Sequence, residues 1–122
     1  MKIREIKDIL EANLLAGEEH LGFDVDFGYG CDLMSDVLAY VQNNVVLLTG
    51  LVHHQVIKTA EMLDIKCVVI VRGKLPEEEI VELARSRDIV LMTTKHSLFT
   101  ACSLLAQRGL PGEEIAHHEI GV

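Results

Sequence analysis

Positive charge is scarce in this sequence. It contains 11 Lys and Arg residues against 19 Asp and Glu residues, which gives a formal net charge of -8 at pH 7. Proteins that bind nucleic acid need a concentrated basic surface to displace counterions from phosphates, and attachment to an anionic membrane also relies on basic residues. We therefore expect neither nucleic acid nor a membrane as a partner. A small anion remains compatible with this charge, because backbone amides can bind it locally.

Long apolar runs are also absent. The longest run, around Cys67–Val71, is far shorter than the roughly 20 residues that a membrane-spanning helix requires. The first ten residues, MKIREIKDIL, are charged and lack the apolar core of a signal peptide. The sequence therefore predicts a cytoplasmic protein.

Cysteine is infrequent, and the metal-binding and catalytic motifs are missing. Cys31, Cys67 and Cys102 lie far apart without Cys-x-x-Cys spacing, which excludes a disulfide framework and a zinc ribbon. The histidine pairs 53–54 and 117–118 rarely chelate one ion, because adjacent side chains diverge by about 100° on a helix. No GxGxxG, GxxxxGK[ST], HExxH or GxSxG motif occurs. We expect no metal, no cofactor and no catalytic residue, and we expect Cys67 to be a buried apolar residue.

The 122 residues are enough for one α/β domain, 1–122, with a substantial core, because 49% of them are hydrophobic. Periodicity predicts helices at 2–11, 32–42, 53–63, 76–87 and 97–108, a short edge strand near 13–17, and strands at 23–29, 45–48, 66–71 and 89–92. Asp32 is the expected N-cap of the second helix. The alternation from residue 23 onward predicts a largely parallel sheet of four or five strands with helices packed on it.

Small and polar residues follow the predicted parallel strands at their carboxyl ends. In an open parallel sheet, ligands bind beyond these ends, where helix N-termini present free N–H groups. Glycines permit close approach of the backbone, and hydroxyl groups can bond to a ligand oxygen. The same residue types also form ordinary turns and caps, so both interpretations remain open. The candidate ligand-binding row consists of Gly30, Asp32, Ser35, Thr49, Gly50, His53, Arg72, Gly73, Thr93, Thr94 and His96.

Three segments together resemble the DRTGG domain family: GYGCDLMSDVLAYV, VLLTGLVHHQVIKTAEMLDIKCVVIVRG and PEEEIVELARSRDIVLMTTKHSLFTACSLL. The shared features are the DLMSDVLA helix start, a strand that ends in threonine, a turn before a proline and a late strand with Thr-Thr. The turn departs from the family's Thr-Gly-Gly and reads Val71-Arg72-Gly73-Lys74. The resemblance implies an α/β domain similar to the N-terminal domain of HPr kinase/phosphorylase. It also implies a regulatory or ligand-sensing role without catalytic activity, since the P-loop of that enzyme's kinase domain is absent.

Three functional hypotheses follow. The first is a non-catalytic regulatory module that binds a small anionic metabolite or nucleotide at the strand ends and signals to a regulatory protein partner. The second is a protein-interaction or assembly domain without a small-molecule ligand. The third is an enzyme that uses Asp32, His53 or Cys31, which requires a nucleophile and a base within reach of each other.

We also expect a homodimer. The predicted strands are rich in Val, Ile and Leu and carry few charges that would protect a sheet edge. The tail after Pro111 adds apolar residues at Ile115, Ile120 and Val122, and it is expected to form a short strand or to contact a partner subunit. A closed two-fold dimer is the commonest way in which soluble proteins cover such surfaces.

Overall fold

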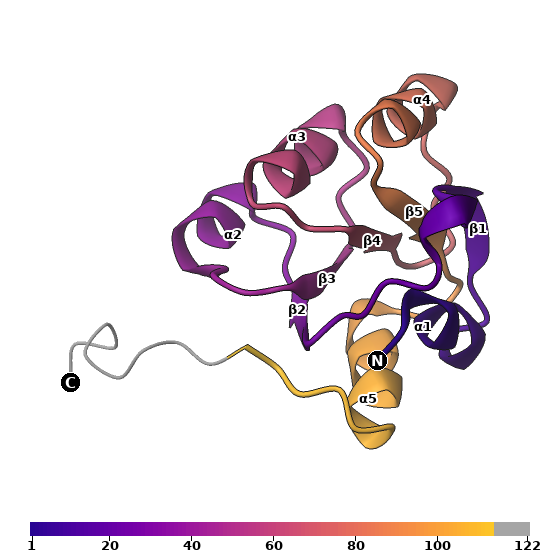
Figure 1. Cartoon of the computed structure of the whole chain (residues 1–122), viewed down its shortest axis with the longest axis vertical. Helices are drawn as coiled ribbons and strands as arrows, with labels where there is room; N and C mark the ends of the chain where they lie inside the picture. The colour runs from indigo at the N-terminus through magenta and orange to yellow at the C-terminus, as the bar shows by residue number, and fades with distance from the viewer. Residues whose placement is uncertain (114–122) are drawn as a thin grey trace.

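A five-stranded sheet forms the centre of the computed structural model, which describes residues 1–113 (Figure 1). Its strands run in the order β1-β5-β4-β3-β2. The β1 strand is antiparallel to β5, and every other neighbouring pair is parallel. The largely parallel α/β sheet that the sequence predicted is therefore confirmed. The strands are β1 (Asn13–Ala16), β2 (Phe27–Gly30), β3 (Val45–Thr49), β4 (Cys67–Ile70) and β5 (Val90–Thr93).

Helices cover both faces of this sheet. Figure 1 shows α2, α3 and α4 on one face, and α1 and α5 on the other. None of the helices in residues 1–113 is long and apolar enough to cross a membrane. The helices are α1 (Ile3–Ile9), α2 (Met34–Tyr40), α3 (His54–Met62), α4 (Glu78–Ser86) and α5 (Leu98–Gln107), and a 3-10 turn, η1, spans Glu18–His20.

Successive side chains of β3 point to opposite faces of the sheet, and both faces are covered by helices. Val45 and Leu47 belong to the core beneath α2, α3 and α4, whereas Val46 and Leu48 belong to the core beneath α1 and α5. All four side chains are at most 1% exposed. A strand that is buried on both faces is apolar on both, and this produces the continuous runs seen in the sequence.

The predicted strand at 23–29 is wrong in its first half. The β2 strand begins only at Phe27, and Asp24 forms an isolated antiparallel bridge with Lys2. Val25 donates its N–H to the carbonyl of Met1 at 2.7 Å and is fully buried. The start of the chain therefore satisfies the backbone of this segment in place of β3. The expected edge strand is confirmed as β1, which closes the sheet beside β5.

The segment after α5 passes beside the open edge of β2. Gly28 donates its N–H to the carbonyl of Pro111 at 2.8 Å, and Gly28 forms a parallel bridge with Gly112. Within residues 1–113 the tail makes this single bridge, and the rest of the segment expected to form a short strand or to contact a partner lies outside the described residues. Ile115, Ile120 and Val122 lie outside the described residues.

The three thiols differ in burial, and this leads to a prediction about their reactivity. Cys67 is 0% exposed, as expected, and burial raises the pKa of its thiol far above the ordinary value. Burial also raises the pKa of Cys102, whereas Cys31 is half-buried in the loop after β2. Because the thiolate is the reactive form, a thiol reagent at pH 8 should modify Cys31 first and Cys67 only in denaturant. Rapid modification of all three thiols in the native chain would contradict this burial.

Candidate functional site

The carboxyl edge of the sheet, where β2, β3, β4 and β5 end, gathers most of the residues of the predicted row. The register pairs Gly30 with Leu48, Thr49 with Ile70, and Ile70 with Thr93. These strand ends therefore lie level with one another. The loops that follow them contact one another through side chains and backbone, and they form the candidate site.

Asp32 bridges two of these loops, so its expected role as a helix N-cap is wrong. Leu33 occupies the N-cap position of α2 and makes no side-chain capping bond. One oxygen of Asp32, Oδ1, instead accepts hydrogen bonds from the N–H of Gly50 at 2.6 Å and from the hydroxyl of Thr49 at 3.1 Å. Both donors lie at the end of β3, where the neighbouring strands no longer offer them carbonyl acceptors. The carboxylate thus ties the loop after β2 to the loop after β3.

Replacing Asp32 by Ala is expected to lower the free energy of unfolding by about 1–2 kcal/mol, because two donors at the end of β3 lose their acceptor. Asp36 in the first turn of α2 provides the control, since its carboxylate makes no hydrogen bond and no ion pair within residues 1–113. Asp36→Ala removes only an interaction with the helix dipole and should cost about 0.5 kcal/mol or less. Urea unfolding of both variants measures the difference, and equal losses would show that the Asp32 bridge contributes nothing.

Gly50 is enclosed by the two basic side chains of the site. The Nζ of Lys74 donates to the carbonyl of Gly50 at 2.8 Å. The guanidinium of Arg72 lies over the α-carbon of Gly50, because a Cβ added there would come within 3.1 Å of the Arg72 Cζ. Any side chain at position 50 would displace this guanidinium. Glycine at this position therefore leaves room for the guanidinium, which is the flexible end of an exposed side chain.

Arg72 reaches this position from a tight turn. Arg72 and Gly73 both have left-handed backbones, with φ of 67° and 68°. Their N–H groups donate to the carbonyls of His96 at 2.7 Å and Thr94 at 2.8 Å, so the turn is fastened to the loop before α5. Within residues 1–113 the guanidinium of Arg72 makes no ion pair and no hydrogen bond. It is exposed, and its charge is available to a ligand.

The two threonines that end β5 are held by internal hydrogen bonds. Thr93 donates its hydroxyl to the carbonyl of Lys74 at 2.8 Å, and Thr94 donates its own to the carbonyl of Leu10 at 2.8 Å. Both side chains are 3% exposed. They fix the Arg72 turn and the end of α1 against the sheet, while half-buried His96 lies at the surface beside them.

Three other predicted residues occupy separate positions along this edge. Gly30 lies against α5, where a Cβ would come within 2.9 Å of the Cys102 sulfur. Ser35 is exposed in the first turn of α2. His53 is the N-cap of α3, and its Nδ1 accepts the N–H of Gln55 at 3.1 Å. The sequence thus assigned these residues to the correct edge but not to specific contacts.

Two hollows lie at the carboxyl edge. One, of about 440 Å³, opens between the starts of α3 and α4 and is lined by residues that include His53, Lys58 and Glu77. The other, of about 300 Å³, lies where β5 ends and is lined by residues that include Thr94 and His96. The Arg72 turn is fastened beside the second hollow through its bonds to Thr94 and His96.

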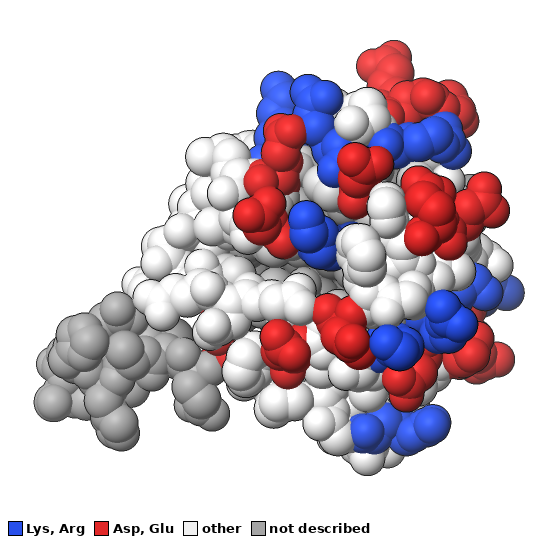
Figure 2. Space-filling model, viewed as in Figure 1, with Lys and Arg blue, Asp and Glu red and all other residues white. Residues whose placement is uncertain are grey.

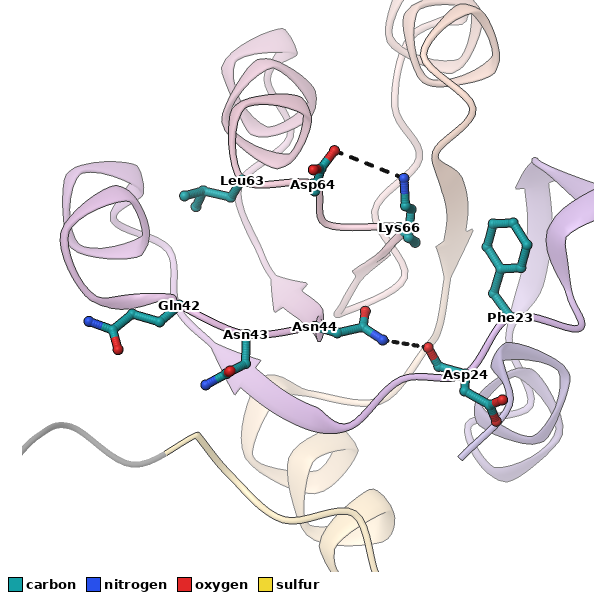
Figure 3. A pocket seen from close by; sticks show the side chains of 8 residues that line it. All are labelled: Phe23, Asp24, Gln42, Asn43, Asn44, Leu63, Asp64 and Lys66. Atoms are coloured by element: carbon teal, nitrogen blue, oxygen red, sulfur yellow. Dashed lines mark hydrogen bonds and ion pairs between the residues drawn. The ribbon is translucent and has the colours of Figure 1, made fainter.

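A larger hollow of about 640 Å³ lies at the amino edge, where the parallel strands begin (Figure 3). Several of its polar side chains are paired with groups of the chain. Asn44 donates its side-chain N–H to the carbonyl of Asp24 at 2.6 Å, and Lys66 lies 4.0 Å from the carboxylate of Asp64. Sequence reasoning missed this hollow, because polar residues before a strand resemble ordinary solvent-exposed loops.

Comparison with protein families identifies the family of this chain. The DRTGG domain model matches residues 5–108. The chain belongs to the DRTGG domain family. The matched residues include all the parallel strands and the whole Arg72 turn. The resemblance drawn from the sequence is therefore confirmed. No curated protein matches the chain.

A solved structure shows the same fold as this DRTGG domain. It contains the CBS and DRTGG domains of the regulatory region of Clostridium perfringens pyrophosphatase, complexed with the activator diadenosine tetraphosphate. The two chains are 24% identical and superpose with a TM-score of 0.73. The match covers 90% of the present chain and 47% of the pyrophosphatase region, so this chain spans about half the length of that region.

Proposed function

We propose that this DRTGG domain is a regulatory module, with no catalytic step of its own, that binds a small phosphate-bearing metabolite or nucleotide at the carboxyl edge. The observation that carries the proposal is the exposed guanidinium of Arg72, which lies over Gly50 without an ion pair in the described residues. An arginine in this state offers the planar set of donors that recognises phosphate oxygens in pairs.

The surroundings of Arg72 favour an anion. Lys74 places a second positive charge two residues further along the same turn. The starts of α3 and α5 open at this edge, and helix N-termini carry partial positive charge. Asp32 is the acidic residue of the loop after β2, and its Oδ1 accepts hydrogen bonds from two donors of the chain. A phosphate group can therefore contact Arg72 without displacing an acidic partner.

The contacts of the Arg72 turn provide a route for a regulatory signal. The turn bonds through its backbone to the loop before α5, and Lys74 and Arg72 contact Gly50 in the loop before α3. A ligand bound by Arg72 would therefore act on a turn that is joined to both loops. The pyrophosphatase regulatory region, which contains CBS and DRTGG domains, is complexed with diadenosine tetraphosphate, and this supports a phosphate-bearing ligand for the present chain.

Thermal unfolding of the full chain with phosphate-bearing compounds tests the proposal. The panel is pyrophosphate, AMP, ADP, ATP and diadenosine tetraphosphate, with adenosine and sodium chloride at matched ionic strength as controls. We expect at least one phosphate-bearing compound to raise the Tm by several degrees, because a ligand that binds only the native state stabilises it. Neither control should raise it. Absence of any shift at millimolar concentrations would contradict the proposal.

The outer surface of α2 favours a second candidate function, assembly with another copy of the chain. Leu33, Leu38 and Tyr40 are 57%, 39% and 41% exposed on or beside this helix. Figure 2 shows the surface over α2 almost free of charged side chains, whereas acidic and basic groups mix over α3 and α4. This helix also flanks β2, the edge strand whose outer side pairs, within residues 1–113, only with Gly112.

Light scattering tests the dimer that this α2 surface and the sequence analysis suggest. Wild type at tens of micromolar should have twice the mass of one chain, and Leu38→Glu should be monomeric because a charge enters an apolar contact. Met62→Glu changes a 71% exposed residue at the end of α3 and serves as the control. A monomeric wild type would exclude assembly at this concentration.

A further inference from the structure

The amino edge holds a cluster of one histidine and two carboxylates. Glu19 and His20 lie in η1, directly after β1, and Asp88 lies just before β5. The antiparallel pairing of β1 with β5 brings the two segments together. The His20 Nε2 is 3.5 Å from an oxygen of Glu19 and 3.6 Å from an oxygen of Asp88, and all three potential ligand atoms lie within 4.8 Å of one another.

The two distances from His20 are long for hydrogen bonds but suit a shared metal ion. Most N–H···O bonds in proteins are about 2.7–3.2 Å long. Ligand atoms that lie about 2.1 Å from a tetrahedral metal ion are separated from each other by about 3.4 Å. The separations of 3.5 and 3.6 Å around Nε2 are close to this value.

The burial of the His20 Nε2 atom also favours a bound cation. Its side chain is 20% exposed, yet its Nε2 atom is shielded from solvent and has no hydrogen-bond partner in the described residues. Its ring stacks on Phe23 with the centroids 5.0 Å apart, which holds the imidazole in place. A buried polar atom without a partner is costly, and an ion between Nε2 and the two carboxylates would remove that cost.

We propose that Glu19, His20 and Asp88 bind a first-row divalent metal ion such as Zn²⁺. One imidazole and two carboxylates form a donor set that zinc accepts, and the remaining position stays open to water. The two acids are 59% and 77% exposed at their side chains, so the ion can enter from solvent. The site is independent of the carboxyl edge, because none of its ligands contacts the Arg72 turn.

Titration of the full chain with Zn²⁺ by calorimetry, together with Co²⁺ absorption spectroscopy, tests this site. We expect one metal equivalent whose affinity falls at least tenfold in both His20→Ala and Asp88→Asn. Asp88→Asn changes only an exposed side chain, so it keeps the test valid if His20→Ala fails to fold. Wild type should also gain about 5 °C in Tm when free Zn²⁺ is about ten times the Kd.

Histidines elsewhere provide the controls. The variants His54→Ala and His117→Ala/His118→Ala should bind Zn²⁺ as wild type does, because the proposed ligands remain. Unchanged affinity in Asp88→Asn, loss of binding in either control, or no binding by wild type would overturn the site. In the last case, His20 would serve only as an ion-pair partner of the two acids.

Discussion

Replacing Gly17 by Ala should lower the free energy of unfolding by about 3 kcal/mol or more. Gly17 has a φ of 90°, a backbone conformation that residues with a side chain rarely adopt. A Cβ there would lie 2.7 Å from the α-carbon of Val90 and 3.2 Å from the carbonyl oxygen of Ile89. Both contacts are with the backbone of β5 or the residue before it, so no rotation of a side chain relieves them. Strain of about 1–2 kcal/mol and overpacking of about 1–3 kcal/mol therefore add.

Gly73→Ala is the matched control for this prediction. Gly73 also has a positive φ, 68°, but a Cβ there would meet no atom within 4 Å. Its replacement should cost only the backbone strain, about 1 kcal/mol. Urea unfolding of the two variants separates the terms. Equal losses would mean that β5 does not approach Gly17 as closely as the structure shows.

Arg72→Gly is expected to lower the affinity for a phosphate-bearing ligand by about 10–100-fold, which corresponds to a charge-assisted hydrogen bond of about 1.5–3 kcal/mol. Stability should change little. Arg72 has a φ of 67°, so glycine relieves about 1 kcal/mol of strain and adds about as much chain entropy to the unfolded state. The variant thus separates the guanidinium from the turn that holds it.

Arg108→Ala is the control for net charge. Arg108 is the exposed C-cap of α5, at the opposite end of that helix from the Arg72 turn. Removing its charge should leave affinity nearly unchanged, and calorimetry on both variants with the ligand found by thermal shift gives the comparison. Equal losses would indicate nonspecific attraction. Unchanged affinity in Arg72→Gly would remove Arg72 from the site.

The buried strands were predictable because their environment determines their composition. The runs that became β3, β4 and β5 are apolar except for the threonines that end β3 and β5, since each strand contacts a helix layer on both faces. The segment 23–26 was not predictable in the same way. Its alternation is that of a strand, yet its backbone pairs with Met1 and Lys2, which a local pattern cannot reveal.

In the candidate site, too, the positions of the strand ends were predictable, whereas contacts between residues distant in the sequence were not. Parallel topology alone places the strand ends at one edge, so the row from Gly30 to His96 could be assigned to that edge. The role of Asp32 could not, because its donors Thr49 and Gly50 are distant in sequence. Lys74 was missed for a similar reason, since its bond to Gly50 depends on the left-handed turn at Arg72 and Gly73.

The amino-edge cluster was the least accessible to sequence reasoning. Its ligands come from two segments that meet only because β1 runs antiparallel to β5. Nothing in the spacing of Glu19, His20 and Asp88 resembles a metal motif, whereas His53 and His54 are adjacent in the sequence. In the structure the centroids of those two rings lie 4.0 Å apart, and the Nδ1 of His53 caps α3 by accepting the N–H of Gln55.

Mapping of amide chemical shifts in the 13.5 kDa chain tests the central claim most directly. Titration with the phosphate-bearing compound that most raises the Tm should move the amide signals of Gly50, Arg72, Gly73 and His96 together. The signals of Asn43, Asn44 and Lys66, which line the amino-edge hollow, should stay in place. Shifts confined to the amino edge, or none at millimolar ligand, would contradict binding at the carboxyl edge.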